Sequence, residues 1–181
     1  TVYLESENEL DAAALVRTVE KQELMLGVVL MGEVQPGFVR TLSACLKPAV
    51  MVSAQYPGLC HSVVANLGQA ATLLVEHLVK LGHRRCGWIG SLHGVGKMLK
   101  RKEATQQALR SFGLQLSPAY DLDMPEADRE NGHRAMSELL TRSGRQPPTA
   151  IICHNAMMAR GAVNHLFQNG WRVPQDISVV A

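Results

Sequence analysis

The chain has 181 residues, of which 46% are hydrophobic and 19% are charged, and this composition is ordinary for a globular protein that buries a core in one or two compact units. The 18 basic residues nearly balance the 16 acidic ones, so the net charge of +2 does not indicate nucleic acid, a membrane surface or a polyanionic substrate as a partner. No apolar run approaches the length of a membrane span, and the first residues lack the pattern of a signal peptide.

The four cysteines, Cys45, Cys60, Cys86 and Cys153, are scattered along the chain, and three of the four lie inside apolar runs. We interpret them as buried thiols of a protein in the reducing cytoplasm. The sequence contains neither a CxxC pair nor a His/Cys group with zinc spacing, so we predict no metal site and no cofactor.

Short apolar runs recur along the whole chain and predict β-strands. In chain order they are Val2 to Leu4, Leu26 to Met31, Ala49 to Val52, Val63 to Val64, Cys86 to Ile89, Ala119 to Leu122, Ala150 to Cys153 and Ile177 to Val180. Pro and Gly bound most of these runs. Whether the eight strands form one sheet or two is left open by the pattern.

Helical segments alternate with these strands and carry apolar residues at helical spacing. Their predicted inward faces are Ala12, Leu15, Val16 and Val19; Phe38, Leu42 and Cys45; Ala71, Leu74, Leu78 and Leu81; Thr105, Ala108, Leu109 and Phe112; Gly132, Met136, Leu139 and Leu140; and Met158, Ala162, His165 and Leu166. Asn66 and Asp128 stand where helix N-caps are expected. The alternation predicts an α/β fold with parallel sheet.

The segment from Pro147 to Val180 shows the pattern most clearly, as a strand, a polar turn, a helix and a second strand. Two strands joined in this way lie parallel, and ligands of open parallel sheets bind beyond the carboxyl ends of the strands. The turn His154-Asn155 is therefore a candidate site. Asn155 can cap the helix and orient a ligand at once, whereas we interpret His154 as a turn residue and not as a catalyst.

The loop from Gly90 to Lys97 stands between a strand and a helix, as a phosphate-binding loop does. Its Gly-Lys pair comes one residue late, and Met98 occupies the position of the required Ser or Thr, so we do not expect nucleotide hydrolysis. The basic run Lys97 to Lys102 has two possible roles: it is a solvated helix face, or it turns Arg101 toward a ligand. A guanidinium is suited to hydrogen bonds with sugar hydroxyls or a carboxylate. The strand-end turns carry no carboxylate, so we predict no enzyme.

Several segments resemble the LacI/GalR family of bacterial transcriptional repressors, in that family's order and spacing. They are VEHLVKLGHRRCGWIG, RKEATQQALRSFGL, GHRAMSELL, PPTAIICHNAMMARGAVNHLFQNG and VPQDISVV. Together they cover most of Asn66 to Val180, and Thr1 to Val64 fits more loosely.

The resemblance implies an α/β fold of two parallel-sheet subdomains, of periplasmic-binding-protein-like type I and incomplete at both ends. Residues 1–65 would form the N-terminal subdomain without its first strand, and residues 66–181 the C-terminal subdomain without its last strands and helix. An effector would bind in the cleft between them. The ligand-binding positions it implies are Ser53, Asn66, His93, Lys97, Arg101 and Asn155, and those of a dimer interface are Met158, Val163 and Phe167.

The function implied is that of the effector-binding core of a cytoplasmic repressor, a homodimer without a membrane partner. A sugar, sugar phosphate or sugar acid would modulate its binding to operator DNA, through a helix-turn-helix domain absent from this chain. Ala156 replaces the family's usual acidic residue and Ser53 is neutral, which favours an anionic effector. The alternatives are a periplasmic sugar-binding protein of an ABC transporter, which requires a signal peptide, and an enzyme built on the same sheet.

Overall fold

The computed structural model describes residues 12–21, 26–32, 35–44, 48–92 and 95–181 of the chain. These residues fall into two compact units, unit 1 (Thr1–Ala65) and unit 2 (Asn66–Ala181), which are described separately. Asn66, where the sequence predicts the crossing between subdomains, is the first residue of unit 2. None of the helices among the described residues is long and apolar enough to cross a membrane.

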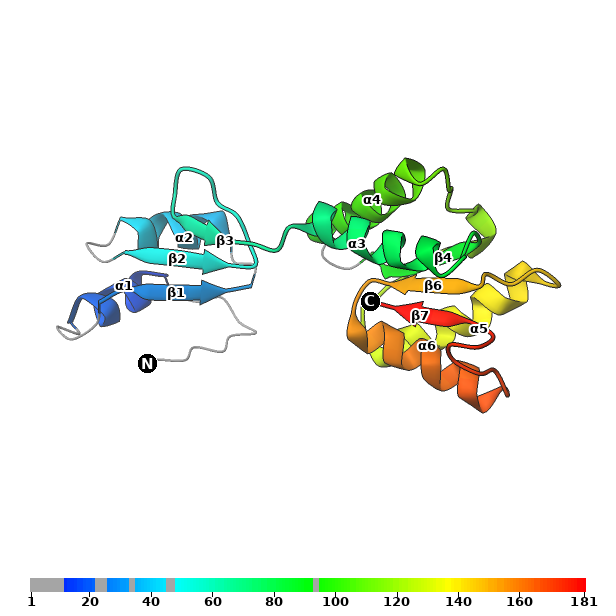
Figure 1. Cartoon of the computed structure of the whole chain (residues 1–181). Helices are drawn as coiled ribbons and strands as arrows, with labels where there is room; N and C mark the ends of the chain where they lie inside the picture. The colour runs from blue at the N-terminus through cyan, green and yellow to red at the C-terminus, as the bar shows by residue number, and fades with distance from the viewer. Residues whose placement is uncertain (1–11, 22–25, 33–34, 45–47, 93–94) are drawn as a thin grey trace. The chain divides into compact units, whose positions relative to one another are not determined.

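Unit 1 is a small α/β layer of helices α1 (Ala12–Lys21) and α2 (Pro36–Ser43) and strands β1 (Val28–Met31), β2 (Ala49–Val52) and β3 (His61–Val63) (Figure 1). The strands are parallel and lie in the order β1-β2-β3. Val39 of α2 packs against Met51 and Ala54 to form its small core. The apolar run that predicts the first strand, Val2 to Leu4, lies outside the described residues.

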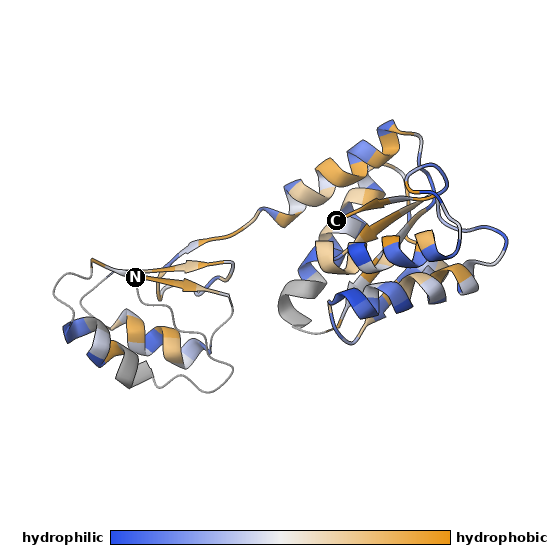
Figure 2. Ribbon diagram, turned by 90° about the horizontal axis from the view of Figure 1, so that it is seen from below, coloured by the Kyte–Doolittle hydropathy of each residue, from blue (hydrophilic) through white to orange (hydrophobic). Residues whose placement is uncertain are grey.

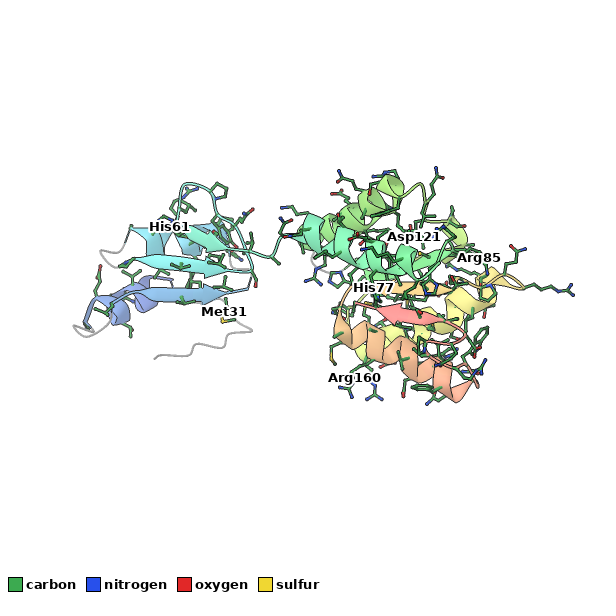
Figure 3. The ribbon with its side chains drawn as sticks, viewed as in Figure 1. Met31, His61, His77, Arg85, Asp121 and Arg160 are labelled. Carbon is green, nitrogen blue, oxygen red and sulfur yellow. The ribbon has the colours of Figure 1, made fainter. Side chains whose placement is uncertain are left out.

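One face of the unit 1 sheet is exposed. The β1 side chains alternate between half-buried and exposed, and those of Val29 and Met31 are 66% and 77% exposed. Figure 2 shows the apolar colour of β1 and β2, and Figure 3 labels Met31 at the end of β1 and His61 at the beginning of β3. A continuous apolar run normally marks a strand that is buried on both faces. Among the described residues of unit 1, β1 is covered on one face and exposed on the other.

Unit 2 contains a four-stranded parallel sheet in the order β5-β4-β6-β7. Its elements are α3 (Leu67–Lys80), β4 (Cys86–Ser91), α4 (Val95–Ser111), the 3-10 turn η1 (Pro118–Tyr120), β5 (Asp121–Met124), α5 (Arg129–Ser143), β6 (Ala150–Cys153), α6 (Ala156–Gln168) and β7 (Ser178–Val180). The described strands therefore form two sheets, one in each unit, and the predicted α/β class is confirmed.

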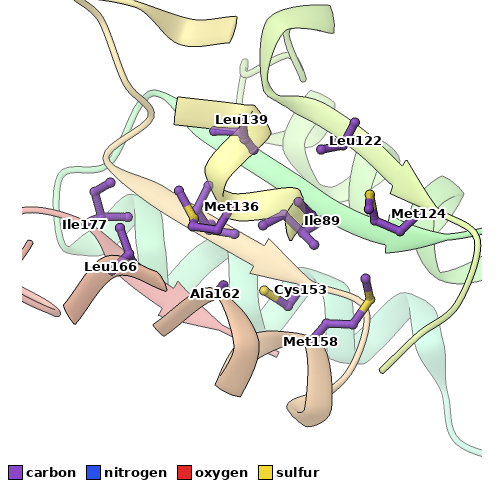
Figure 4. Close-up of a cluster of buried hydrophobic side chains, with 12 residues drawn as sticks. Ile89, Leu122, Met124, Met136, Leu139, Cys153, Met158, Ala162, Leu166 and Ile177 are labelled. Carbon is purple, nitrogen blue, oxygen red and sulfur yellow. The ribbon is translucent and has the colours of Figure 1, made fainter. Parts of the chain in front are cut away.

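Helices cover both faces of the unit 2 sheet. On one face Met136 and Leu139 of α5 and Leu166 of α6 pack against Ile89 and Ile151 (Figure 4). On the other face α3 and α4 pack against alternate residues of the same strands, including Trp88 and Ile152. Every residue of the central strands β4 and β6 is buried, which explains why these strands are apolar without alternation.

Several predicted details differ from the structure. The strand predicted at Ala119 to Leu122 begins later, because Pro118 starts a 3-10 turn and β5 runs from Asp121 to Met124. Leu81 and Phe112, predicted to face inward, are 60% and 36% exposed. Each comes directly after the last residue of its helix, where the helical face no longer continues over the sheet.

His83 connects the beginnings of the central and edge strands of unit 2. Its Nδ1 lies 3.0 Å from Oγ1 of Thr149, which precedes β6, and its Nε2 lies 3.0 Å from Oγ of Ser178, the first residue of β7. Both ring nitrogens are thus satisfied by hydroxyl groups that either donate or accept. The pKa of His83 is lowered, mainly by burial and to a smaller extent by the nearby charge of His77.

Two glycines allow α5 and α6 to touch through their backbones. A Cβ atom on Gly161 would lie 2.0 Å from the carbonyl oxygen of Arg129, and one on Gly132 would lie 2.2 Å from the carbonyl oxygen of Met158. These distances are far inside van der Waals contact, and the obstructing atoms belong to backbone. No side chain other than hydrogen fits at either position.

We therefore expect Gly161→Ala to lower the free energy of unfolding by about 3 kcal/mol, because the two helices must separate to admit the methyl group. Urea denaturation of the two proteins measures the difference. Gly68→Ala in α3 is the matched control, since its Cβ would meet only the side-chain oxygen of Asn66 at 3.6 Å. That control should gain up to about 1 kcal/mol from helix propensity, and an equal loss in both variants would contradict the steric explanation.

Candidate functional site

The carboxyl ends of β4, β5 and β6 meet at one edge of the unit 2 sheet. The backbone N–H of His154 donates to the carbonyl oxygen of Ile89 at 2.8 Å, and that of Leu92 donates to Met124 at 2.8 Å. The hydroxyl of Ser91 donates to the carbonyl oxygen of Pro125 at 3.2 Å. These contacts bring the turns after the three strands side by side, as a parallel sheet requires.

Asn155 connects two of these turns. Its Oδ1 accepts a hydrogen bond from the backbone N–H of Met158 at 2.9 Å, which makes it the N-cap of α6. Its Nδ2 donates to the carbonyl oxygen of Ala127, in the turn between β5 and α5, at 2.9 Å. The side chain keeps one lone pair and one N–H for a ligand, so the predicted capping role is observed and the predicted ligand role stays a prediction.

Arg101 reaches the same turn from α4. Its Nη1 donates to the backbone carbonyl oxygen of His154 at 2.5 Å. Arg101 is exposed, and no ion pair joins it to a carboxylate within the described part of the chain. A guanidinium carries five N–H donors, so most of this group stays available for a planar acceptor.

The ring of His154 is buried beside Arg101. The residue is 8% exposed, its ring stands edge-on to Trp88 with the ring centroids 6.3 Å apart, and its Nδ1 has no hydrogen-bond partner among the described residues. Burial, together with the positive charge of Arg101 and against the weaker opposing effect of Asp123, lowers the pKa of His154 to about 4. The imidazole is therefore neutral at neutral pH and keeps an unused polar atom.

Lys102, the residue after Arg101, points into the α4 face of the sheet. Its Nζ lies 2.6 Å from Oδ1 of Asp121 and 2.5 Å from Oδ2 of Asp123, and Trp88 donates its Nε1–H to the second oxygen of Asp123 at 2.9 Å. Burial opposes the charge on Lys102, but its hydrogen bonds to the two carboxylates outweigh burial and raise its pKa. Asp121 is labelled in Figure 3.

Within unit 2, two of the predicted site residues lie at one turn. Arg101 and Asn155 meet at the turn after β6. Asn66 caps α3, accepting from the backbone N–H of Gln69 at 3.0 Å. Ser53 follows β2 in unit 1, with a left-handed φ of 69°. His93 and the side chain of Lys97 lie outside the described residues.

Sequence reasoning missed the buried ring of His154 and the pairing of Lys102 with the aspartates of β5. A signal existed for the first, because His154 follows an apolar strand whose side chains alternate between faces, so that it continues the face of Ile152. A signal for the second was present in the i, i+2 spacing of Asp121 and Asp123, which puts both carboxylates on one face of a strand.

The predicted dimer surface requires one correction. Met158 is fully buried in the core of unit 2, against the sheet, so its side chain cannot reach a second chain. Val163 is half-buried, and Phe167 is 60% exposed. Their part in a dimer stays a prediction.

No three His, Cys, Asp or Glu side chains of the described residues lie close enough together to hold a metal ion. The described cysteines, Cys60, Cys86 and Cys153, are free thiols. Burial raises the pKa of Cys153 to about 12, so this thiol stays protonated.

The two hydrogen bonds of Asn155 can be separated by substitution. Asn155→Ala should cost about 2 kcal/mol of unfolding free energy, because it removes both the cap and the bond to Ala127. Asn155→Ser should cost about half as much, since its hydroxyl still caps α6 but cannot reach across to Ala127. Denaturant unfolding measures both values, and equal losses in the two variants would show that the contact between the turns contributes nothing.

The buried imidazole predicts how stability depends on pH. The pKa of His154 is lowered from 6.5 to about 4 in the folded protein. The imidazole of the unfolded chain is therefore protonated below pH 6.5, whereas that of the folded chain is protonated only below about pH 4. Unfolding free energy should therefore fall as the pH falls through this window. His154→Gln removes the titrating group, and its unfolding free energy should fall less steeply over the same window; identical slopes in the two proteins would contradict the assignment.

Comparison with known proteins identifies the family. The family model described as a periplasmic binding protein-like domain matches residues 75–181. The probable HTH-type transcriptional repressor ExuR of Bacillus subtilis is 34% identical over 119 residues, which cover 66% of this chain and 35% of that protein. The HTH-type transcriptional regulator GalR of Salmonella typhimurium is 37% identical over 134 residues, covering 72% of this chain and 38% of that protein.

The fold agrees with this comparison. The crystal structure of a regulatory protein of the LacI family from Chloroflexus aggregans superposes with a TM-score of 0.80 at 23% identity, over 95% of this chain and 62% of that one. This chain spans about a third of the length of the curated relatives it matches. It belongs to the periplasmic binding protein-like family and resembles, within it, the effector-binding core of LacI/GalR-type transcriptional regulators.

Proposed function

We propose that this chain is the effector-binding and dimerisation core of a LacI-type transcriptional repressor, with a sugar or sugar derivative as its effector. The observation that carries the proposal is that Arg101 and Asn155 both lie at the turn after β6, at the carboxyl edge of the unit 2 sheet. Arg101 donates to the backbone of this turn, and Asn155 belongs to it. Both side chains keep hydrogen-bonding groups there after their internal contacts are counted, and parallel sheets bind ligands at this edge.

The site is suited to binding. An arginine fork and an amide present several donors and acceptors in fixed directions, which matches the hydroxyls of a sugar or the oxygens of an acid. We propose that it binds its effector without transforming it. Ser53, Asn66, His93 and Lys97 remain proposed contacts of the effector.

Regulation would follow from a shift between two conformations. An effector changes such an equilibrium only through a difference in its affinity for the two states. In the whole protein this shift would alter the binding of operator DNA through a helix-turn-helix domain, and the protein would act in the cytoplasm. The named relatives are transcriptional regulators, which favours this proposal over a transporter's periplasmic binding protein.

Effector binding can be tested on the chain itself with a panel of sugars, sugar acids and sugar phosphates. At least one compound should raise the melting temperature of the protein, since a ligand that binds only the folded state stabilises it. Arg101→Gln should lower the affinity for that compound at least about tenfold, through the loss of hydrogen bonds from a charged group. Lys100→Gln, which removes a charge from the neighbouring residue of α4, is the control; equal losses in both variants would refute a specific role for Arg101.

Dimerisation is tested separately by sedimentation equilibrium. We expect Phe167→Glu to weaken the dimer at least about tenfold, because it would place a charge in a contact that is proposed to be apolar. Leu73→Glu, at an exposed apolar position of α3, is the matched control and should leave the association unchanged. A dimer that survives Phe167→Glu would remove α6 from the proposed interface.

A further inference from the structure

Lys102 stands at an inward position of α4, where this helix packs on the unit 2 sheet. Thr105 and Leu109, one and two turns further along the same face, are 5% and 1% exposed, and this spacing is that of the core-facing stripe of a helix. The side chain of Lys102 itself is 19% exposed. A charge is costly at such a position unless it is paired, so partners within the protein must match it.

Two carboxylates of β5 supply this match, and one of them extends the contact to β4. Nζ of Lys102 binds Asp121 and Asp123, and the second oxygen of Asp123 accepts a hydrogen bond from Nε1 of Trp88. Gly90, two residues beyond Trp88 on the same face of β4, makes room for this bond, because a Cβ atom there would overlap both Nε1 of Trp88 and Oδ1 of Asp123. The strand residues around Lys102 thus form one connected polar network.

The contacts of this network close on α4 again. Trp88 stands edge-on to the ring of His154, and the carbonyl oxygen of His154 accepts from Nη1 of Arg101. The circuit therefore starts and ends on neighbouring residues of α4, and it joins this helix to β5, β4 and the end of β6. Because neighbouring residues of a helix point about 100° apart, Lys102 is held against the sheet while Arg101 extends to its carboxyl edge.

Stability alone does not account for the circuit. A partly buried ion pair gains little over well-packed apolar side chains, because desolvation of the charges offsets most of their attraction. Hydrogen bonds have defined directions, however, so a satisfied polar network selects one rotation of a helix where an apolar contact tolerates several.

We propose that Lys102 is a positioning residue, which together with Asp121 and Asp123 sets the rotation of α4 so that Arg101 reaches the turn after β6. The consequence for binding rests on the proposed function: an effector held by Arg101 would depend on Lys102 without touching it. The positioning role itself is a property of the chain without a ligand, so the two can be tested apart.

The test observes Arg101 directly, by nitrogen NMR of the arginine side chains in the full chain without a ligand. Nη1 of Arg101 is bonded to a carbonyl oxygen, so rotation about the Cζ–Nε bond should be slow and the two Nη resonances separate; Arg101→Gln identifies them by their loss. Lys102→Met should accelerate this rotation at least about tenfold, which corresponds to losing one hydrogen bond of a charged group. Lys102→Arg, which still pairs with carboxylates, should restore the slow rotation.

Matched variants make the result specific. Lys100→Met removes an exposed charge from the same turn of α4 and should keep the two resonances apart. Asp123→Asn retains an acceptor for Trp88 but weakens the hold on Lys102, and it should accelerate the rotation even if Lys102→Met does not fold. The resonances are recorded on folded protein, so a loss of stability alone would leave them unchanged.

The inference is wrong if the Nη resonances stay separate in both Lys102→Met and Asp123→Asn, or if the rotation is already fast in the unaltered protein. Binding of glucose, glucuronate and glucose 6-phosphate then separates it from the proposed function. A compound that depends on Arg101 should bind Lys102→Met at least about tenfold more weakly, and equal binding would refute the positioning role. If none of these compounds depends on Arg101 while Lys102→Met still frees its side chain, the proposed effector contact fails and the positioning role stands.

Discussion

Two hydrogen bonds from side chains to backbone carbonyls hold the turn between β6 and α6, and the geometry of the whole carboxyl edge depends on them. Arg101 fixes this turn from α4, and Asn155 fixes it to the turn before α5 while capping α6. Three helical crossovers are thereby joined at one point. Because loop backbone at a sheet edge otherwise has few partners, such bonds set the positions of the donors that a ligand meets.

Close packing beneath this edge keeps the turn in place. Gly132 and Gly161 let α5 and α6 approach until backbone meets backbone, and Met158, two residues beyond the start of α6, fills the core below. A displacement of α6 would therefore open a cavity and break its N-cap at the same time. Unit 1 differs, since Val29 and Met31 on one face of its sheet are largely exposed.

Local patterns predicted much of the fold. The strands at Ala49–Val52 and Ala150–Cys153 have the predicted bounds, and Asn66, Asp128 and Asn155 cap their helices because a side-chain acceptor before a helix acts within three residues. The strand pattern alone left the number of sheets open, since that number depends on pairing between distant strands, whereas the family resemblance implied two parallel sheets, as observed. Met158 shows where two predictions disagreed: helical spacing assigned it to the inward face of α6, where it lies, whereas the resemblance implied a dimer contact that its burial excludes.

The two histidines at opposite edges of the unit 2 sheet show how structural and functional polar groups differ. His83, at the amino edge, has a hydroxyl oxygen against each ring nitrogen and needs no further partner. His154, at the carboxyl edge, is more deeply buried and yet leaves Nδ1 without one. Folding alone gives no reason to retain such a group, because an apolar side chain would fill the same space beside Trp88 at lower cost. His83 therefore ties the starts of two strands together through both of its ring nitrogens, whereas Nδ1 of His154 contributes no such tie among the described residues at the opposite edge.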